Sequence, residues 1–367
     1  MTDRDADGGT MGAERTEWTA IELLESDEVA EPLLAGGVRC HGGFGSDGGY
    51  LPPRTRFRTP AIEAWQARHR DEFRSEIIEA PLDMWPEPYP NLAQTRYLLG
   101  EGVRDPIVTI LTRIGTVEGF GALIRHVGFG DPQRHFAESV AGTAVAHLEN
   151  GLFEAHARDE AGWESEAGHK DMWFAARDIA FEHPVTEDET ALMLERMGIS
   201  TPGAPPSPEA MLQAASEMRI FADIDLSLEM TIRRMISILL IEVQAFHLFA
   251  WAEDLLSDDG LVAGEGAAAR LVACIRADET PHVEYLRTAL TEMRDRTFVG
   301  ESGRGHPGDE VIGRLWDDAV ADSLGPRREQ QLRTTVAEVE HALAGHRRRD
   351  EILEGFHARG TVHPATA

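Results

Sequence analysis

Lysine is almost absent from this chain, and cysteine is scarce. Among its 367 residues, 64 are acidic and 35 are basic, and Lys170 is the only lysine. The formal net charge of −29 argues against nucleic acid as a partner, because binding phosphates requires a basic surface, and against anionic membranes. Cys40 and Cys274 lie far apart and show no metal-type spacing. Without a disulfide framework, the expected location is the cytoplasm.

Long apolar runs are also lacking. The first residues, MTDRDADGGTMGAERTE, are polar and acidic, unlike a secretory signal. The most apolar window, 235–256, is interrupted by Glu242 and His247. Because charge at the centre of a bilayer is costly, we expect no membrane span here.

Strand-like alternation of any length is missing, and helical periodicity dominates. We therefore predict an all-α fold with three regions. Residues 1–105 form an N-terminal arm with a disordered start of sixteen residues, short helices and an irregular loop at 31–60. Residues 106–298 form a helical bundle, with an insertion rich in Pro and Ser at 198–210. Residues 299–367 form a C-terminal helical extension.

Two acidic residues stand alone inside apolar helical sequence. Glu118 is the only acid between Asp105 and Asp131, and Glu242 lies within ILLIEVQAF. Their helical neighbours are apolar, so both carboxylates should face the core. A buried carboxylate persists when it is protonated, paired with arginine or bound to a metal. For Glu242 the candidate partners are Arg233 and Arg276.

The spacing of the acids suggests that they converge. Glu242 and Glu279 are separated by 37 residues with the turn SDDG near the midpoint, so an antiparallel helix pair brings them to one level. Glu118 and Glu149 are separated by 31 residues across the turn GFGDP. Two such hairpins form a four-helix bundle with carboxylates at its centre. Two cations would neutralise four of them.

The stretch LVACIRADETPHVEYLRTAL, residues 271–290, places Glu279 and His282 one turn apart on an apolar helical face. Pro281 lies between them, within a predicted helix over 264–295. An interior proline costs a helix about 3 kcal/mol because a hydrogen bond is lost. The freed carbonyl would loosen the helix beside the two side chains.

This pattern resembles the ferritin-like di-iron carboxylate proteins, in which two helices each supply a Glu and two supply Glu-x-x-His. The resemblance covers 106–298. It implies that Glu279-Thr-Pro-His282 is the last ligand helix, that Glu242 is the third-helix ligand and that Glu118 is the first. Asp278 would be the outer acceptor that orients a ligand imidazole.

The second ligand helix has two competing solutions. Glu149 is followed by His156 seven residues later, which resembles the haem-oxygenase-like di-iron oxidases, although Ile275 stands where that branch has a further histidine. Alternatively, Glu166-Ala-Gly-His169 supplies the Glu-x-x-His, with another first-helix acid such as Glu138. Both alternatives stay open at this point.

The resemblance implies an enzyme with two iron ions, or iron and manganese, and O₂ as co-substrate. We expect a di-iron oxidoreductase, an oxygenase (monooxygenase) or oxidase, acting on a small organic substrate. No flavin or iron–sulfur motif is visible, so an external reductase or ferredoxin would supply electrons. A homodimer is compatible with this class. The alternatives are a ferritin-like protein that oxidises iron or scavenges peroxide, and a metal-free helical scaffold whose buried acids pair with arginine.

Overall fold

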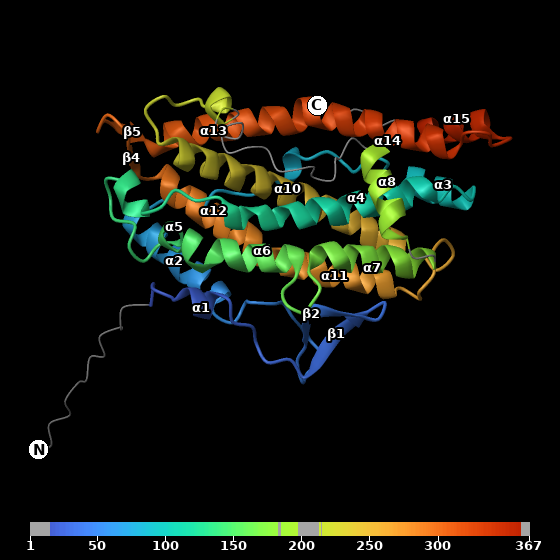
Figure 1. Ribbon diagram of the computed structural model, residues 1–367, viewed down its shortest axis with the longest axis horizontal. Helices are drawn as coiled ribbons and strands as arrows, with labels where there is room; N and C mark the ends of the chain where they lie inside the picture. Colours follow the sequence, from blue (N-terminus) through green and yellow to red (C-terminus); the bar gives the residue numbers. More distant parts are fainter. Residues whose placement is uncertain (1–14, 183–184, 197–212, 214, 361–367) are drawn as a thin grey trace, which may run out of the picture.

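The computed structural model describes residues 15–182, 185–196, 213 and 215–360, and it is mostly helical, as predicted. The predicted insertion at 198–210 and all but the last two residues of the predicted disordered start lie outside this part of the chain. The longest helices run along the long axis of the molecule (Figure 1).

Four helical arms surround the centre of the molecule. The first arm is α4, which packs on α7 of the second arm. In turn, α7 packs on α11 of the fourth arm, and α11 packs on α10, which is the third arm. The arms consist of α4 (Asp105–Gly121), α6 (Phe153–Ala161) with α7 (His169–Phe181), α10 (Leu226–Leu256), and α11 (Ala267–Asp278) with α12 (Thr280–Arg294).

The fourth arm is two helices and not the single helix predicted over 264–295. The break falls at Glu279, between α11 and α12. Pro281 consequently lies in the first turn of α12, where its missing N–H costs nothing. The proline therefore sets the position of the break beside Glu279 and His282.

The second arm is also broken into two helices. A tight loop over 162–168 separates α6 from α7. Gly162 has φ +81°, and a Cβ there would lie 2.5 Å from the carbonyl oxygen of Glu166. A Cβ at Gly168 would lie 2.2 Å from the nitrogen of Gly162. Only glycine fits at both ends of this loop.

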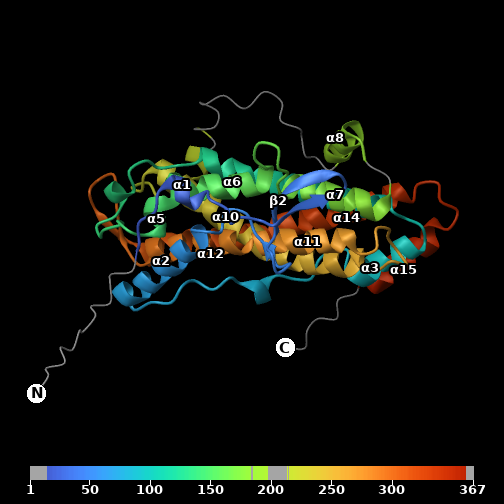
Figure 2. The same ribbon diagram turned by 90° about the horizontal axis from the view of Figure 1, so that it is seen from below.

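A small sheet occupies part of the region predicted as an irregular loop at 31–60, and that prediction is wrong. Three antiparallel strands, in the order β1-β2-β3, lie against the junction of α6 and α7, where the N–H of His41 donates to the carbonyl of Ala167 at 3.0 Å (Figure 2). The glycines of β2 hide any alternation in the sequence. The strands are β1 (Glu31–Ala35), β2 (Val38–Phe44) and β3 (Tyr50–Leu51).

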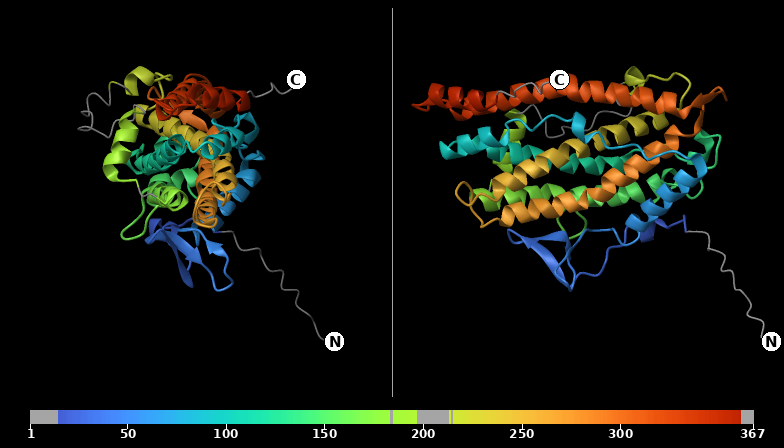
Figure 3. Two further views of the ribbon diagram at one scale, coloured as in Figure 1. Left: turned by 90° about the vertical axis from the view of Figure 1, so that its right-hand side faces the viewer. Right: turned by 180° about the vertical axis from the view of Figure 1, so that it is seen from behind.

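The C-terminal helices lie on the side of the molecule opposite this sheet, as the end-on view in Figure 3 shows. The helix α13 packs on α10 and α12, and α14 packs on α4. The predicted helical extension is therefore present, after a short hairpin. These elements are β4 (Thr297–Val299), β5 (Gly305–Pro307), α13 (Gly308–Asp322), α14 (Arg328–Ala342) and α15 (Arg349–Arg359).

Two helical stretches, 105–126 and 226–256, are long and apolar enough to cross a membrane. In their most apolar windows, however, 56% and 61% of the residues are buried inside the protein, as in the core helices of a folded bundle. The remaining α-helices of the described residues are α1 (Ala20–Leu23), α2 (Arg58–Phe73), α3 (Leu92–Gly100), α5 (Ala144–His147) and α8 (Glu187–Arg196).

Candidate metal centre

Seven ionisable side chains from the four arms meet at the centre of the molecule, and all are buried. None is more than 6% exposed. Each arm supplies at least one, and the broken second and fourth arms supply most of them. They are Glu118 from α4, His156 and Glu160 from α6, His169 from α7, Glu242 from α10, Glu279 from the α11–α12 break and His282 from α12.

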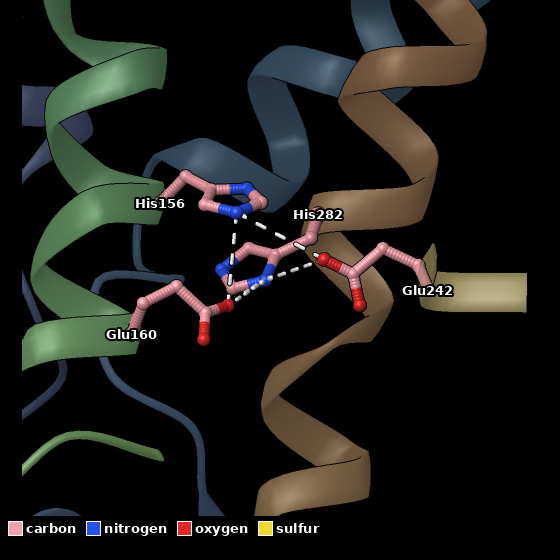
Figure 4. Close-up of side chains that lie close together, drawn as sticks. All are labelled: His156, Glu160, Glu242 and His282. Carbon is pink, nitrogen blue, oxygen red and sulfur yellow. Dashed lines mark ion pairs between the residues drawn. The ribbon is translucent and has the colours of Figure 1, made fainter. Parts of the chain in front are cut away.

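One group of four is shown in Figure 4. The Nε2 atom of His156 lies 3.6 Å from Oε1 of Glu160 and 3.9 Å from Oε1 of Glu242. The Nδ1 atom of His282 lies 3.3 Å and 3.8 Å from the same two oxygens. All four ligand atoms lie within 4.8 Å of one another, close enough to surround a single cation.

A second group overlaps the first. The Nδ1 atom of His169 lies 3.4 Å from Oε2 of Glu160 and 2.8 Å from Oε1 of Glu279. The Nδ1 atom of His282 lies 2.6 Å from Oε2 of Glu279. Glu160 thus turns one oxygen toward each group. The two groups share Glu160 and His282.

Glu118 completes the set from α4. Burial raises the pKa of its carboxyl well above the usual range, and the charges of Glu160 and Glu279 raise it further. Close packing of α4 on α6 requires a glycine, because a Cβ at Gly121 would lie 2.7 Å from Cγ of Glu160.

The ligand atoms fit a metal because many of them have no hydrogen-bond partner. Buried polar atoms are nearly always satisfied, and each one left unpaired costs free energy. A cation at the centre would satisfy all of these atoms at once. The unpaired atoms are Nε2 of His156, both Oε atoms of Glu160, Nδ1 of His169, Oε2 of Glu242 and Oε1 of Glu279.

Arginine does not neutralise these glutamates. Arg233 pairs with Glu229 and Asp318, and Arg276 pairs with Glu253. In the described residues, no arginine lies within ion-pair distance of the four central glutamates. The alternative of a metal-free helical scaffold depended on ion pairs between arginine and these glutamates.

Without a metal, the surroundings favour the protonated forms of Glu242 and His282. Burial, together with Glu279 and Glu160, raises the pKa of Glu242 well above its usual range. Burial opposes the charged form of His282, but the carboxylate of Glu279 raises its pKa well above normal. Metal ions would replace these protons on binding.

An outer layer fixes the orientation of His282. Its Nε2 atom lies 2.8 Å from Oδ2 of Asp159, so Nδ1 faces the centre. Asp159 is held in turn by Arg54 at 2.5 Å and Arg58 at 2.8 Å. A carboxylate behind a histidine ligand is the usual outer partner at metal sites.

The other two histidines have outer partners as well. The Nε2 atom of His169 lies 3.5 Å from Asp278, to which Tyr50 donates at 3.0 Å and His41 lies at 3.1 Å. Asp278 therefore lies where the predicted outer acceptor should be. The Nδ1 atom of His156 lies 3.3 Å from the hydroxyl of Tyr285. Each imidazole thus keeps one nitrogen free for the centre.

The structure brings together six of the eight sequence-predicted residues, namely Glu118, His156, His169, Glu242, Glu279 and His282. Glu149 and Glu166 lie elsewhere, so both of the alternative second-helix pairs are wrong as pairs. In each pair the histidine lies at the centre and the glutamate lies away from it.

Glu149 is displaced because the backbone leaves the helix after it. Gly151 has φ +132°, so the two-turn spacing from Glu149 to His156 does not hold. The carboxylate is exposed and accepts hydrogen bonds from the N–H groups of Phe129 at 2.7 Å and Gly130 at 3.0 Å.

Glu166 lies in the loop between α6 and α7 and pairs with Arg39 at 3.1 Å. Glu138, the acid considered as its first-helix partner, accepts a hydrogen bond from the N–H of Thr297 at 2.7 Å. Neither side chain faces the centre.

The residue that the sequence reasoning missed is Glu160. It lies in the charged run ARDEAGWESE, which is typical of an exposed face. Two signals were available. His156 is four residues earlier, on the same helical face. Asp159-Glu160 repeats the dipeptide Asp278-Glu279, and in both the Asp holds a histidine from another arm while the Glu faces the centre.

The outer partners His41, Tyr50, Arg54 and Arg58 were also missed, because their pairing with the bundle is non-local.

Comparison of the chain with protein-family models, with curated proteins and with solved structures finds no match.

Proposed function

We propose that this protein is an O₂-dependent di-iron oxygenase or oxidase with a ferritin-like core, acting on a small organic substrate. In this proposal the ligands are the four glutamates Glu118, Glu160, Glu242 and Glu279 and the three histidines His156, His169 and His282. Manganese could replace one iron, because imidazole and carboxylate ligands suit both metals.

The observation that carries the proposal is the set of buried ligand atoms without partners. Four glutamates inside a protein are expensive unless cations of high charge neutralise them. The second ring nitrogens of His282 and His156 lie at 2.8 Å and 3.3 Å from Asp159 and Tyr285. That of His169 lies 3.5 Å from Asp278 and makes no hydrogen bond. A centre organised in two layers is typical of a bound metal.

A reduced pair of iron ions, when bound, supplies the electrons that activate O₂. The protein contributes position and exclusion of water. Asp159 keeps the proton of His282 on Nε2, away from the centre, and the paired Arg54 and Arg58 keep Asp159 charged. The side chains around the centre are almost fully buried, which restricts water and strengthens the electrostatic interactions inside.

A cavity gives a substrate access to this centre. It has a volume of about 600 Å³, lies between α4 and α10, and is also lined by residues of the segment 326–334. Glu118 is one of its lining residues, so the cavity reaches the ligand set. This volume is in the range of small-molecule sites. The cavity favours an oxygenase or oxidase over an iron-oxidising storage protein, which needs no organic pocket.

Oxygen uptake tests the proposal. Anaerobic protein loaded with ferrous iron and mixed with O₂ should consume one molecule of O₂ for each pair of ferrous ions, faster than free ferrous iron in the same buffer. Glu242→Ala should abolish the fast phase, because its carboxylate lies in the first group of ligands. Uptake no faster than that of free iron would contradict the proposal.

A further inference from the structure

The cavity beside Glu118 has one apolar wall and one charged end. The wall contains Ile114 and Val117 from α4, and Ala245 and Leu248 from α10. The basic residue of α4 in the cavity is Arg113, five residues before Glu118. At about 1.5 Å per residue, the two lie about 7.5 Å apart along the helix axis.

Arg113 is unusual because no described residue pairs with it. It makes no hydrogen bond and no ion pair within the described part of the chain. Desolvation lowers the pKa of its guanidinium group, and only the charge of Glu338 acts in the opposite direction. Acidic residues outnumber basic ones 64 to 35 in this chain, so an unpaired arginine in a cavity is unexpected.

Other arginines lie around this cavity and the hollows beside it. Arg327 lines the cavity, and Arg328 lines two adjoining hollows that share Gln244 and Gln331 with it. Desolvation and the positive charge of Arg327 lower the pKa of Arg234, and desolvation lowers the pKa of Arg328. Within the described residues, only Arg327 of these three has an acidic partner, Asp322.

We infer that the cavity binds an organic anion, a carboxylate carried on an apolar body, with the carboxylate at Arg113 and the body directed along the apolar wall toward Glu118. This inference rests on the proposed function and names its substrate class. The guanidinium group suits a carboxylate because it can donate two parallel hydrogen bonds. An apolar body of several carbon atoms spans the distance to the ligand set and matches the aliphatic wall.

Equilibrium binding of octanoate tests the inference, with octan-1-ol and octylammonium as neutral and cationic counterparts of equal length. Octanoate should bind at least about tenfold more tightly than octan-1-ol, because a charge-assisted hydrogen bond is stronger than a neutral one. Arg113→Gln should weaken octanoate binding by about tenfold to a hundredfold and leave octan-1-ol binding unchanged. Arg113→Lys should restore part of the affinity.

Two further variants locate the binding site. Thr334→Trp places a large side chain in the cavity from α14 and should reduce octanoate binding as strongly as Arg113→Gln. Arg104→Gln is the matched control, because Arg104 is an exposed arginine at the N-terminus of α4 and outside this cavity. Its octanoate affinity should equal that of wild type.

Equal binding of the three probes, or unchanged octanoate binding in Arg113→Gln, would overturn the inference. Each titration is run on chelator-treated and on iron-loaded protein with the iron content measured. Iron uptake without octanoate binding refutes the substrate class alone. Octanoate binding that requires Arg113 in a protein that takes up no iron refutes the di-iron function and leaves the anion site in place.

Discussion

We expect Asp159→Asn to destabilise the protein by about 3–5 kcal/mol, because the substitution leaves two buried guanidinium groups without a counter-charge. The side chain of Asp159 is fully buried and holds Arg54 at 2.5 Å and Arg58 at 2.8 Å. Chelator-treated protein should be used, so that loss of metal does not contribute. Circular dichroism should show the melting temperature lowered by roughly 6–15 °C.

The pH dependence of this difference has a defined sign. Burial alone raises the pKa of Asp159, but Arg54, Arg58 and the hydrogen bond from His282 hold it well below the usual value of 3.8. The stabilisation is therefore complete above that unfolded-state value and is lost as the pH falls below it. The part of the gap that comes from ionised Asp159 should therefore be lost only below about pH 4.

A matched control is Asp350→Asn, since Asp350 pairs with Arg349 at the surface and its side chain is 94% exposed. This change should alter the free energy of unfolding by less than about 0.5 kcal/mol. If Asp159→Asn melted at the wild-type temperature at pH 7, Asp159 would not be needed to balance the charges of Arg54 and Arg58.

Glu160→Ala is expected to empty the centre while the protein stays folded. Glu160 belongs to both groups of ligands, so its removal takes a carboxylate from each cation. The fold should tolerate the change, because one of four mutually repelling buried carboxylates is removed. Elemental analysis after iron-supplemented expression should find less than about a tenth of the wild-type metal, with an unchanged circular dichroism spectrum.

Glu149→Ala and Glu166→Ala are the matched controls. Both residues are sequence-predicted ligands that the structure places away from the centre, at the turn near Phe129 and beside Arg39. Both variants should keep the wild-type metal content. Metal loss in either control, together with retention in Glu160→Ala, would refute the ligand set.

The half of the centre formed by Glu242, Glu279 and His282 was predictable because regular helices carry these residues. Glu242 lies in an uninterrupted helix of 31 residues, where spacing along the chain converts directly into position. Glu279 and His282 are one turn apart, and the break at Glu279 leaves that turn intact. Each of the three also stands out from an apolar surrounding.

The half formed by His156, Glu160 and His169 was not predictable by the same reasoning, because the helical segment that carries these residues is interrupted twice. The irregular turn at Gly151 moves Glu149 off the helical face, and the loop over 162–168 takes Glu166 to the surface. Periodicity carried across either break assigns the wrong face. Glu160 lies between the two breaks, on the short regular helix α6, in a charged run that continues to the exposed Glu164.

The N-terminal region shows a different limit of sequence reasoning. Its strands are short, and β2 has Gly42 and Gly43 in place of alternating side chains. Sheet pairing and contact with the bundle both depend on residues far away in the chain, such as Ala167 and Asp278. No local pattern could assign Tyr50 to the outer layer of the centre, since Asp278 is 228 residues away from it.

The most direct test of the central claim is the ferrous-iron stoichiometry of the wild-type protein. Chelator-treated protein would be titrated anaerobically with ferrous iron, and bound metal counted after gel filtration. The two overlapping groups around Glu160 predict two ions per chain. A folded protein that binds no iron, or binds equal amounts in wild type and Glu160→Ala, would contradict the account and leave protons as the only charge that balances these glutamates.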